Sequence, residues 1–224
     1  MADAFPASRK LGMKLYGYFR SSAAYRVRIA LNLKGLSYEY LPVNLREGEQ
    51  LAAPYRAINA QQLVPVLCDD RGAFTQSLSI IEYLEERYPE PALLPRSPQA
   101  RARVRAIALS IACDIHPLDN TRVLQYLTRT LGVSEEAKDG WYRHWIELGF
   151  AALEAQLAGD PATGPFCHGQ QPTLADVCLV PQLANARRVA MPLDGYPTLL
   201  GIEAACMALP AFAAAAPQRQ PDAA

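Results

Sequence analysis

Two adjacent serines, Ser21 and Ser22, stand where a short apolar segment ends and a helical pattern begins. At the start of a helix, backbone N–H groups and the positive end of the helix dipole point at one spot, which stabilises an anion. If the anion is a thiolate, a serine hydroxyl adds a charge-assisted hydrogen bond. Lowering a thiol pKa from about 8.5 by roughly two units requires about 2.7 kcal/mol, which these effects together can supply. The alternative is a simple pair of helix-capping serines.

Two further positions could hold the rest of a ligand. Pro65 follows Val64 at the start of a predicted strand, where proline removes a hydrogen-bond donor from the sheet. A cis bond there would turn the Val64 N–H and C=O outward to hold an extended peptide, whereas the alternative is an ordinary trans proline. Gln76 and Ser77 open the next predicted helix, a second natural place for an anion such as a carboxylate. Ser77 could also be only a helix cap.

The elements that must position these residues form a mixed sheet. Residues 13–17 and 38–43 are strand-like, and a helix lies between them and ends at Gly35. This order predicts two parallel strands joined by a right-handed crossover. Residues 64–67 and 73–75 predict a hairpin, followed by a helix over 77–87. We expect a four-stranded sheet in a first domain of residues 13–90, after a loose leader of residues 1–12.

The second part of the chain predicts helices only. Four prolines between Pro89 and Pro98 mark a connector, and we expect an all-helical domain over residues 99–217. One amphipathic helix covers 104–115, and a later one carries a core-facing stripe of Trp141, Trp145, Leu148, Ala152 and Leu153. Thr173 and Asp176 have the spacing of a capping box that opens a helix running towards Arg188.

Composition excludes several classes of function. The 22 basic and 22 acidic residues balance, so no overall field attracts nucleic acid or an anionic membrane. Arg101, Arg103 and Arg105 alternate along a helix and so predict ordinary solvated side chains. Five scattered cysteines favour reduced thiols in the cytoplasm, without a metal site. The first residues given lack the long apolar stretch typical of a signal peptide, and no run of about 18 apolar residues follows, so we expect no membrane-spanning helix.

The motifs together resemble one family. They are the aromatic-Arg-Ser-Ser segment with Arg-Val-Arg-Ile-Ala-Leu, then Leu-Val-Pro, Gln-Ser-Leu-Ser-Ile-Ile-Glu-Tyr-Leu-Glu, Ile-His-Pro-Leu-Asp-Asn and Thr-Leu-Ala-Asp. In this order and spacing, from Met13 to the tail at Asp222, the chain resembles zeta-class glutathione transferases. That class includes maleylacetoacetate isomerases and bacterial maleylpyruvate isomerases. The resemblance implies an α/β thioredoxin-like N-terminal domain, an all-α C-terminal domain, glutathione as cofactor and a homodimer.

For glutathione, the resemblance implies that Ser21 is the hydroxyl nearest the sulfur, with Ser22 beside it. Val64, next to a cis Pro65, would bind the cysteinyl backbone, and Gln76 and Ser77 would hold the γ-glutamyl end. Asn120 is a further implied glutathione contact. Ala23 stands where many zeta members have cysteine, which argues against a role for a protein thiol there.

For the substrate, the resemblance points to Arg20, His116, Asn120 and Arg188, drawn from both domains and expected to converge in a cleft. Arginines suit a maleyl substrate because a guanidinium binds a carboxylate in bidentate fashion. Without the resemblance, Arg20 would be a surface charge, Arg188 a solvated helix end and His116 a structural residue. Thr121 replaces an arginine found in some maleylpyruvate isomerases.

The leading hypothesis is isomerisation of maleylacetoacetate to fumarylacetoacetate in the catabolism of aromatic compounds. The glutathione thiolate would add to the cis double bond, which could then rotate before the sulfur leaves. Catalysis is assigned to Ser21, Ser22 and Arg20. The alternatives are a maleylpyruvate isomerase, a general glutathione-conjugating transferase and a non-catalytic glutathione-binding scaffold. A disulfide reductase is disfavoured because Ser21 to Ala24 occupy the place of a Cys-x-x-Cys motif.

Overall fold

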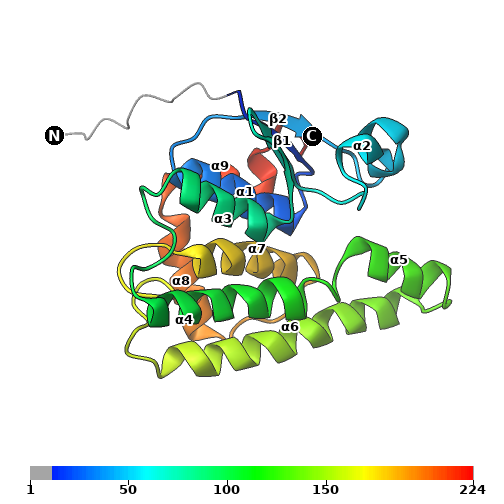
Figure 1. Cartoon of the computed structure of the whole chain (residues 1–224). Coiled ribbons are helices and arrows are strands. Elements are labelled where there is room, and N and C mark those ends of the chain that lie inside the picture. The colour runs from blue at the N-terminus through cyan, green and yellow to red at the C-terminus, as the bar shows by residue number, and fades with distance from the viewer. Residues whose placement is uncertain (1–11, 224) are drawn as a thin grey trace. The chain divides into compact units, whose positions relative to one another are not determined.

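The chain divides into two compact units in a computed structural model, which describes residues 12–223 (Figure 1). The first unit contains the chain up to Leu93 and again from Ala208 onward. The second unit runs from Leu94 to Met207. The leader expected at residues 1–12 falls outside the described residues except for Gly12.

The first unit is built on a four-stranded sheet. Its strands are β1 (Lys14–Gly17), β2 (Glu39–Pro42), β3 (Val66–Asp69) and β4 (Gly72–Thr75), in the order β2-β1-β3-β4. β1 is parallel to β2 and antiparallel to β3, and β3 and β4 form a hairpin. The helices are α1 (Ser22–Leu33), α2 (Ala53–Ile58), α3 (Ser77–Arg87) and α9 (Pro210–Ala215), with short 3-10 turns η1 (Glu49–Leu51), η3 (Pro217–Arg219) and η4 (Pro221–Ala223). The predicted thioredoxin-like sheet is confirmed.

Apolar residues at strand and helix spacing explain why these elements pack. Leu15 of β1 and Leu67 of β3 are fully buried, as are Ile29 of α1 and Ile80 of α3. Figure 1 shows α1 and α3 side by side, with α2 apart from them. Gly35 ends the first helix with a φ of 63°, a left-handed conformation that costs glycine little. This turn lets the chain leave α1 and return to the sheet as β2.

The last helix returns to the first unit. α9 packs on α1, where Asn32 Nδ2 donates to the Ala211 carbonyl at 3.0 Å and the Tyr25 hydroxyl to the Phe212 carbonyl at 3.4 Å. Phe212 is fully buried. The boundary predicted at residue 217 differs from this division, because residues 208–217 pack with the sheet unit. A sequence pattern shows that a helix is amphipathic, but not which domain its apolar face covers.

The second unit is helical throughout its described residues. Its elements are α4 (Pro98–Leu109), the π-helix η2 (Ser110–Ile115), α5 (Thr121–Arg129), α6 (Glu135–Ala158), α7 (Leu174–Arg188) and α8 (Pro197–Met207). α7 is the central helix, since almost all of its residues are buried. The predicted capping box is present: Asp176 Oδ2 accepts from the Thr173 N–H at 2.7 Å. Asp176 also holds the preceding loop by accepting from the Cys167 N–H at 2.7 Å.

Two details of the predicted helices are wrong. The first is the buried face of α6, which is formed by Tyr142, Ile146, Phe150, Leu153 and Leu157, whereas Leu148 of the predicted stripe is 58% exposed. Leu153 belongs to both sets, Trp141 and Trp145 are half-buried, and both sets repeat at helical spacing, so periodicity alone placed the buried face only in part.

Arg103 is the second correction, because it is not an ordinary solvated side chain. Its guanidinium pairs with Asp160 at 2.7 Å and donates to the Thr163 hydroxyl at 2.8 Å and the Cys167 carbonyl at 2.6 Å. It therefore fastens the loop before α7 to α4. A sequence shows the charge of such a residue but not the distant loop that folds over it.

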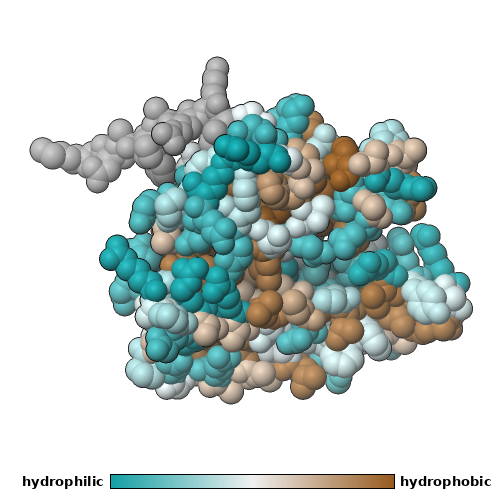
Figure 2. Space-filling view, in the orientation of Figure 1, coloured by the Kyte–Doolittle hydropathy of each residue, from teal (hydrophilic) through white to brown (hydrophobic). Residues whose placement is uncertain are grey.

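The surface shown in Figure 2 carries hydrophobic residues in small groups between hydrophilic ones. No helix within residues 12–223 is long and apolar enough to cross a membrane. Within the same residues, no group of three histidine, cysteine or acidic side chains is arranged to hold a metal ion.

Candidate functional site

The N-terminus of α1 carries the predicted serines. Ser21 is the N-cap, half-buried, and its Oγ accepts from the Ala24 N–H at 3.2 Å. Ser22 begins the helix and is buried. The first turn contains no acidic residue, so the positive end of the helix is not neutralised by its own side chains. The capping alternative is thus seen in the structure, and the same position can also hold an anion.

The N-terminus of α3 has an unusual backbone. Gln76 precedes the helix with a φ of 66°, a conformation that non-glycine residues rarely adopt and that is common at binding sites. Its side chain donates to Gln61 Oε1 at 2.9 Å. Ser77 is buried and its hydroxyl accepts from Arg26 Nη1 of α1 at 3.3 Å. The first turn of α3 contains no acidic residue either.

The segment before β3 contains the cis Val64–Pro65 bond, as the resemblance implied. Two side chains fix the peptide group just before it. The Tyr55 hydroxyl donates to the Leu63 carbonyl at 2.7 Å, and Asn59 Nδ2 donates to the same oxygen at 2.8 Å. Burial raises the pKa of the Tyr55 phenol, so this donor keeps its proton. Val64 itself packs against the small cluster of Val43, Tyr55 and Val66.

Arg20 lies in the loop between β1 and α1 and is exposed. Its guanidinium carbon stands 5.1 Å from the centre of the Phe19 ring, a cation–π contact that orients the side chain. Arg20 and Ser21 are neighbours in one loop, so the structure places a cation beside the candidate thiolate position.

In the second unit, His116 and Asn120 flank a short turn. His116 follows the π-helix η2, stands just before Pro117 and is half-buried. Asn120 caps α5, accepting from the Arg122 N–H at 3.1 Å. Gly149 of α6 lies against η2, because a Cβ there would stand 2.2 Å from Ile115 Cδ1. The position of this turn therefore depends on a glycine in another helix.

Arg188 is not a free helix end. Its Nη2 donates to the Tyr142 hydroxyl at 2.6 Å, and its guanidinium carbon lies 5.5 Å from the centre of that ring. The neighbouring Asp119 is 5% exposed, and burial raises the pKa of its carboxyl to about 8 against the opposing charge of Arg188. Burial likewise raises the pKa of Tyr142 to about 12. An arginine, a tyrosine and a buried carboxyl thus form one polar cluster in which Arg188 carries the charge.

Sequence reasoning missed several of these residues. Tyr55, Asn59 and Gln61 belong to a loop region without a recognisable motif. Tyr142 follows Trp141, which belongs to the predicted helical stripe, and Asp119 precedes Asn120, which the family resemblance identifies. Only the contacts made after folding distinguish them from their neighbours.

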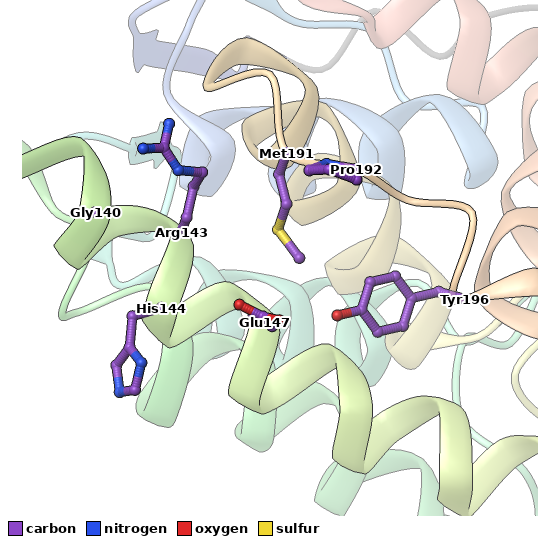
Figure 3. A pocket seen from close by; sticks show the side chains of 7 residues that line it. All are labelled: Gly140, Arg143, His144, Glu147, Met191, Pro192 and Tyr196. Atoms are coloured by element: carbon purple, nitrogen blue, oxygen red, sulfur yellow. The ribbon is translucent and has the colours of Figure 1, made fainter. Parts of the chain in front are cut away.

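A pocket of about 290 Å³ lies elsewhere in the second unit, lined by Gly140, Arg143, His144, Glu147, Met191, Pro192 and Tyr196. Figure 3 shows Glu147, Met191 and Tyr196 turned toward one another, while His144 points away. None of the predicted site residues lines this pocket.

The fold and the two helix starts define a glutathione S-transferase architecture, and sequence models of that family match both units. The N-terminal domain of glutathione S-transferases matches residues 15–92, and the C-terminal domain matches residues 136–214.

The relatives that match over nearly the whole chain indicate which class of the glutathione S-transferase family it belongs to. The chain is 54% identical to a probable maleylacetoacetate isomerase of Vibrio cholerae, over 95% of this chain and 99% of the relative. It is 51% identical to a maleylpyruvate isomerase of Ralstonia, over 95% of this chain and all of the relative. The chain therefore belongs to the zeta class of the glutathione S-transferase family.

Two solved structures are closely similar. One is the holo structure of a bacterial zeta-class maleylpyruvate isomerase, with 51% identity, a TM-score of 0.93, and coverage of 94% of this chain and 100% of the other. The second is a maleylacetoacetate isomerase from Methylobacterium extorquens with bound malonate and glutathione. It shares 42% identity and a TM-score of 0.92, over 94% of this chain and 99% of the other.

Proposed function

We propose that the protein isomerises maleylacetoacetate to fumarylacetoacetate, with glutathione as cofactor. The observation that carries the proposal is Ser21 at the N-cap of a helix whose first turn lacks acidic residues. This arrangement stabilises a thiolate. High identity to a probable maleylacetoacetate isomerase over nearly the whole chain supports the choice of substrate.

The residues of the first unit fit glutathione. We assign Ser21 to the sulfur, with Ser22 beside it, because the N-cap hydroxyl and the helix N–H groups can all face one anion. Val64 is assigned to the cysteinyl backbone beside Pro65, because Tyr55 and Asn59 hold the adjoining peptide in place.

Gln76 and Ser77 are assigned to the γ-glutamyl end, with the uncompensated N-terminus of α3 facing its carboxylate. Glutathione, when bound, supplies a thiolate that adds reversibly to the cis double bond, so that rotation about it becomes possible. Ser21 keeps the sulfur ionised by donating its hydroxyl proton in a hydrogen bond.

Arg20 and Arg188 are assigned to the two ends of the diacid, with His116 and Asn120 as further contacts, Asn120 also reaching glutathione. Their convergence in one cleft is part of this proposal. A dicarboxylate, malonate, is bound together with glutathione in the relative from Methylobacterium extorquens. Arg188 is held by Tyr142, so its guanidinium is pre-oriented, which lowers the entropy lost on binding a carboxylate. Positive charge at both ends also stabilises the negative charge that develops on the carbonyl oxygens.

A second candidate substrate is maleylpyruvate, which the relative from Ralstonia supports. The two acids share the cis double bond and the carboxylate next to it, so the same residues can serve both. Thr121 stands where the resemblance implies an arginine in some maleylpyruvate isomerases, so one carboxylate contact of that variant is absent, and the residue pattern alone does not choose between the two acids.

The test is a pair of assays with and without glutathione, one on each acid, with loss of the cis isomer followed by chromatography. We expect turnover only with glutathione, and a higher kcat/KM for maleylacetoacetate. A folded protein that turns over neither acid would overturn the proposal. If it instead conjugates glutathione to an electrophile, and conjugation survives replacement of Arg20 and Arg188 by alanine, the protein is a general transferase.

We also propose a cytoplasmic homodimer. All five cysteines are free in the structure, as expected in a reducing compartment. Light scattering of the purified protein tests the dimer, and cell fractionation tests the compartment.

A further inference from the structure

The loop that carries Arg20 and Ser21 is hydrogen-bonded by two charged side chains that belong to other segments of the chain. Asp222 Oδ2 accepts from the Phe19 N–H at 2.9 Å, although the two residues are 203 positions apart. Arg28 Nη2 donates to the Phe19 carbonyl at 3.1 Å. Both polar groups of the residue just before Arg20 are therefore bound by side chains of other segments.

Each of these side chains is itself fixed. Arg28 is fully buried, and its Nε donates to the Ala215 carbonyl at 2.9 Å, which ties α1 to the end of α9. The Tyr40 hydroxyl donates to Asp222 Oδ2 at 3.3 Å, joining the tail to β2. Figure 1 shows the C-terminal end of the chain beside β1 and β2.

Electrostatics favours this arrangement. Burial lowers the pKa of the Arg28 guanidinium, and the charge of Asp222 is among the groups that raise it again. A buried cation is costly unless an anion or several acceptors surround it. The charge of Asp222 therefore acts on the Arg28 cation, after those of Tyr40, Tyr38 and Tyr25, while its carboxylate oxygen holds the Phe19 N–H.

We propose that Asp222 is a positioning residue for the glutathione site: through the Phe19 N–H it sets the loop that carries Arg20 and Ser21. The inference rests on the proposed function, because it concerns the loop to which the thiolate and one substrate carboxylate are assigned. It extends the site to the tail of the chain, whose residues contact neither ligand in the proposal.

The experiment compares three variants of the full chain. Asp222→Ala removes the acceptor, Asp222→Asn keeps an amide oxygen that can accept the same N–H, and Gln220→Ala is the matched control. Gln220 lies in the same tail, and its side-chain amide donates to the carbonyls of Ala214 and Ala216 at 3.0 and 2.9 Å. Its replacement alters the tail but keeps the acceptor of the Phe19 N–H.

Three readouts separate positioning from general stability. Hydrogen exchange of the Phe19 amide is measured in the ligand-free protein, the glutathione Kd by calorimetry, and the pKa of the bound thiol by its ultraviolet absorbance. For Asp222→Ala we expect faster exchange, about tenfold weaker glutathione binding, and a raised thiol pKa, since a charged acceptor is lost. Asp222→Asn should recover part of each effect, and Gln220→Ala should match the unaltered protein.

Two results would overturn the inference. One is a folded Asp222→Ala variant with unaltered Phe19 exchange, Kd and thiol pKa. The other, if that variant does not fold, is an Asp222→Asn variant that is indistinguishable from Gln220→Ala in all three readouts. Failure of the unaltered protein to bind glutathione would instead overturn the proposed function, while the exchange measurement would still decide whether Asp222 holds the loop.

Discussion

Replacement of Ser21 by alanine separates the two roles of its hydroxyl. In the ligand-free protein the hydroxyl oxygen caps α1 through the Ala24 N–H at 3.2 Å. Loss of such a cap costs about 0.5–2 kcal/mol of stability. In the complex, the hydroxyl would also donate to the glutathione sulfur, and a hydrogen bond to a charged group contributes about 1.5–3 kcal/mol. At about 1.36 kcal/mol per unit, the pKa of the bound thiol should rise by about one to two units.

This rise predicts a pH-dependent defect. If the helix and serine lower the thiol pKa to about 6.5, the variant titrates near 7.5–8.5, and its thiolate fraction at pH 7 falls about three- to twenty-five-fold. The kcat/KM profile of Ser21→Ala should therefore shift to higher pH and approach that of the unaltered protein above the new pKa. The bound thiolate is followed directly by ultraviolet absorbance as pH is varied.

A matched control exists in the second unit. Ser97 caps α4 by accepting from the Ala100 N–H at 3.2 Å, the same geometry without a proposed ligand. Ser97→Ala should lose a similar amount of stability and leave the thiol pKa unaltered. A bound-thiol pKa that does not change in Ser21→Ala would refute the assignment of this hydroxyl to the sulfur.

Other perturbations test separate parts of the molecule. Arg188→Ala should lower kcat/KM for the diacid about ten- to a hundredfold, because it removes a charged contact to a carboxylate. Arg187→Ala, which breaks an exposed pair with Glu203, should alter kcat/KM less than about twofold. Steady-state kinetics measures both, and equal effects would contradict the assignment of Arg188 to a substrate carboxylate. Asp119 has a native pKa of about 8 against an unfolded value near 3.9, so the native state holds a proton that the unfolded state releases between these values. The free energy of unfolding should thus fall by up to about 1.4 kcal/mol per pH unit from about pH 4 to 8. Asp119→Asn should remove this pH dependence in a series of urea unfolding curves. An unaltered pH dependence in the variant would show that another group titrates. Lys34→Met should lower the free energy of unfolding of the first unit by about 3–5 kcal/mol, measured by urea unfolding. The buried lysine pairs with Glu85 at 2.7 Å, and its replacement leaves that carboxylate without its cation. A decrease below about 1 kcal/mol would contradict this prediction.

The sequence predicted the parts of the fold that depend on local patterns. The β-α-β order, the hairpin and the helix over residues 77–87 follow from spacing and turn residues, and the structure has them. The capping box at Thr173 was also readable, because its two residues are three positions apart. Ser21 was identifiable because it marks the transition from strand to helix.

The remaining features depend on contacts that no local pattern encodes. The positive φ of Gln76 could not be predicted, because such a backbone conformation is usually indicated by a glycine and this position holds a glutamine. The face that α6 buries was chosen by packing, since Leu148 fits the helical period as well as Phe150 does. Tyr142 and Arg188 are 46 positions apart, so their hydrogen bond exists only in the folded chain.

The division of the chain has a consequence for its biosynthesis. The sheet unit is assembled from residues up to Leu93 and from Ala208 onward, so α1 obtains its α9 neighbour only after the intervening 114 residues, Leu94–Met207, have been translated. A nascent chain that ends within the helical unit has Ser21 but neither Ala215 nor Asp222. We therefore expect ribosome-bound intermediates to contain a folded helical unit before the sheet unit is complete.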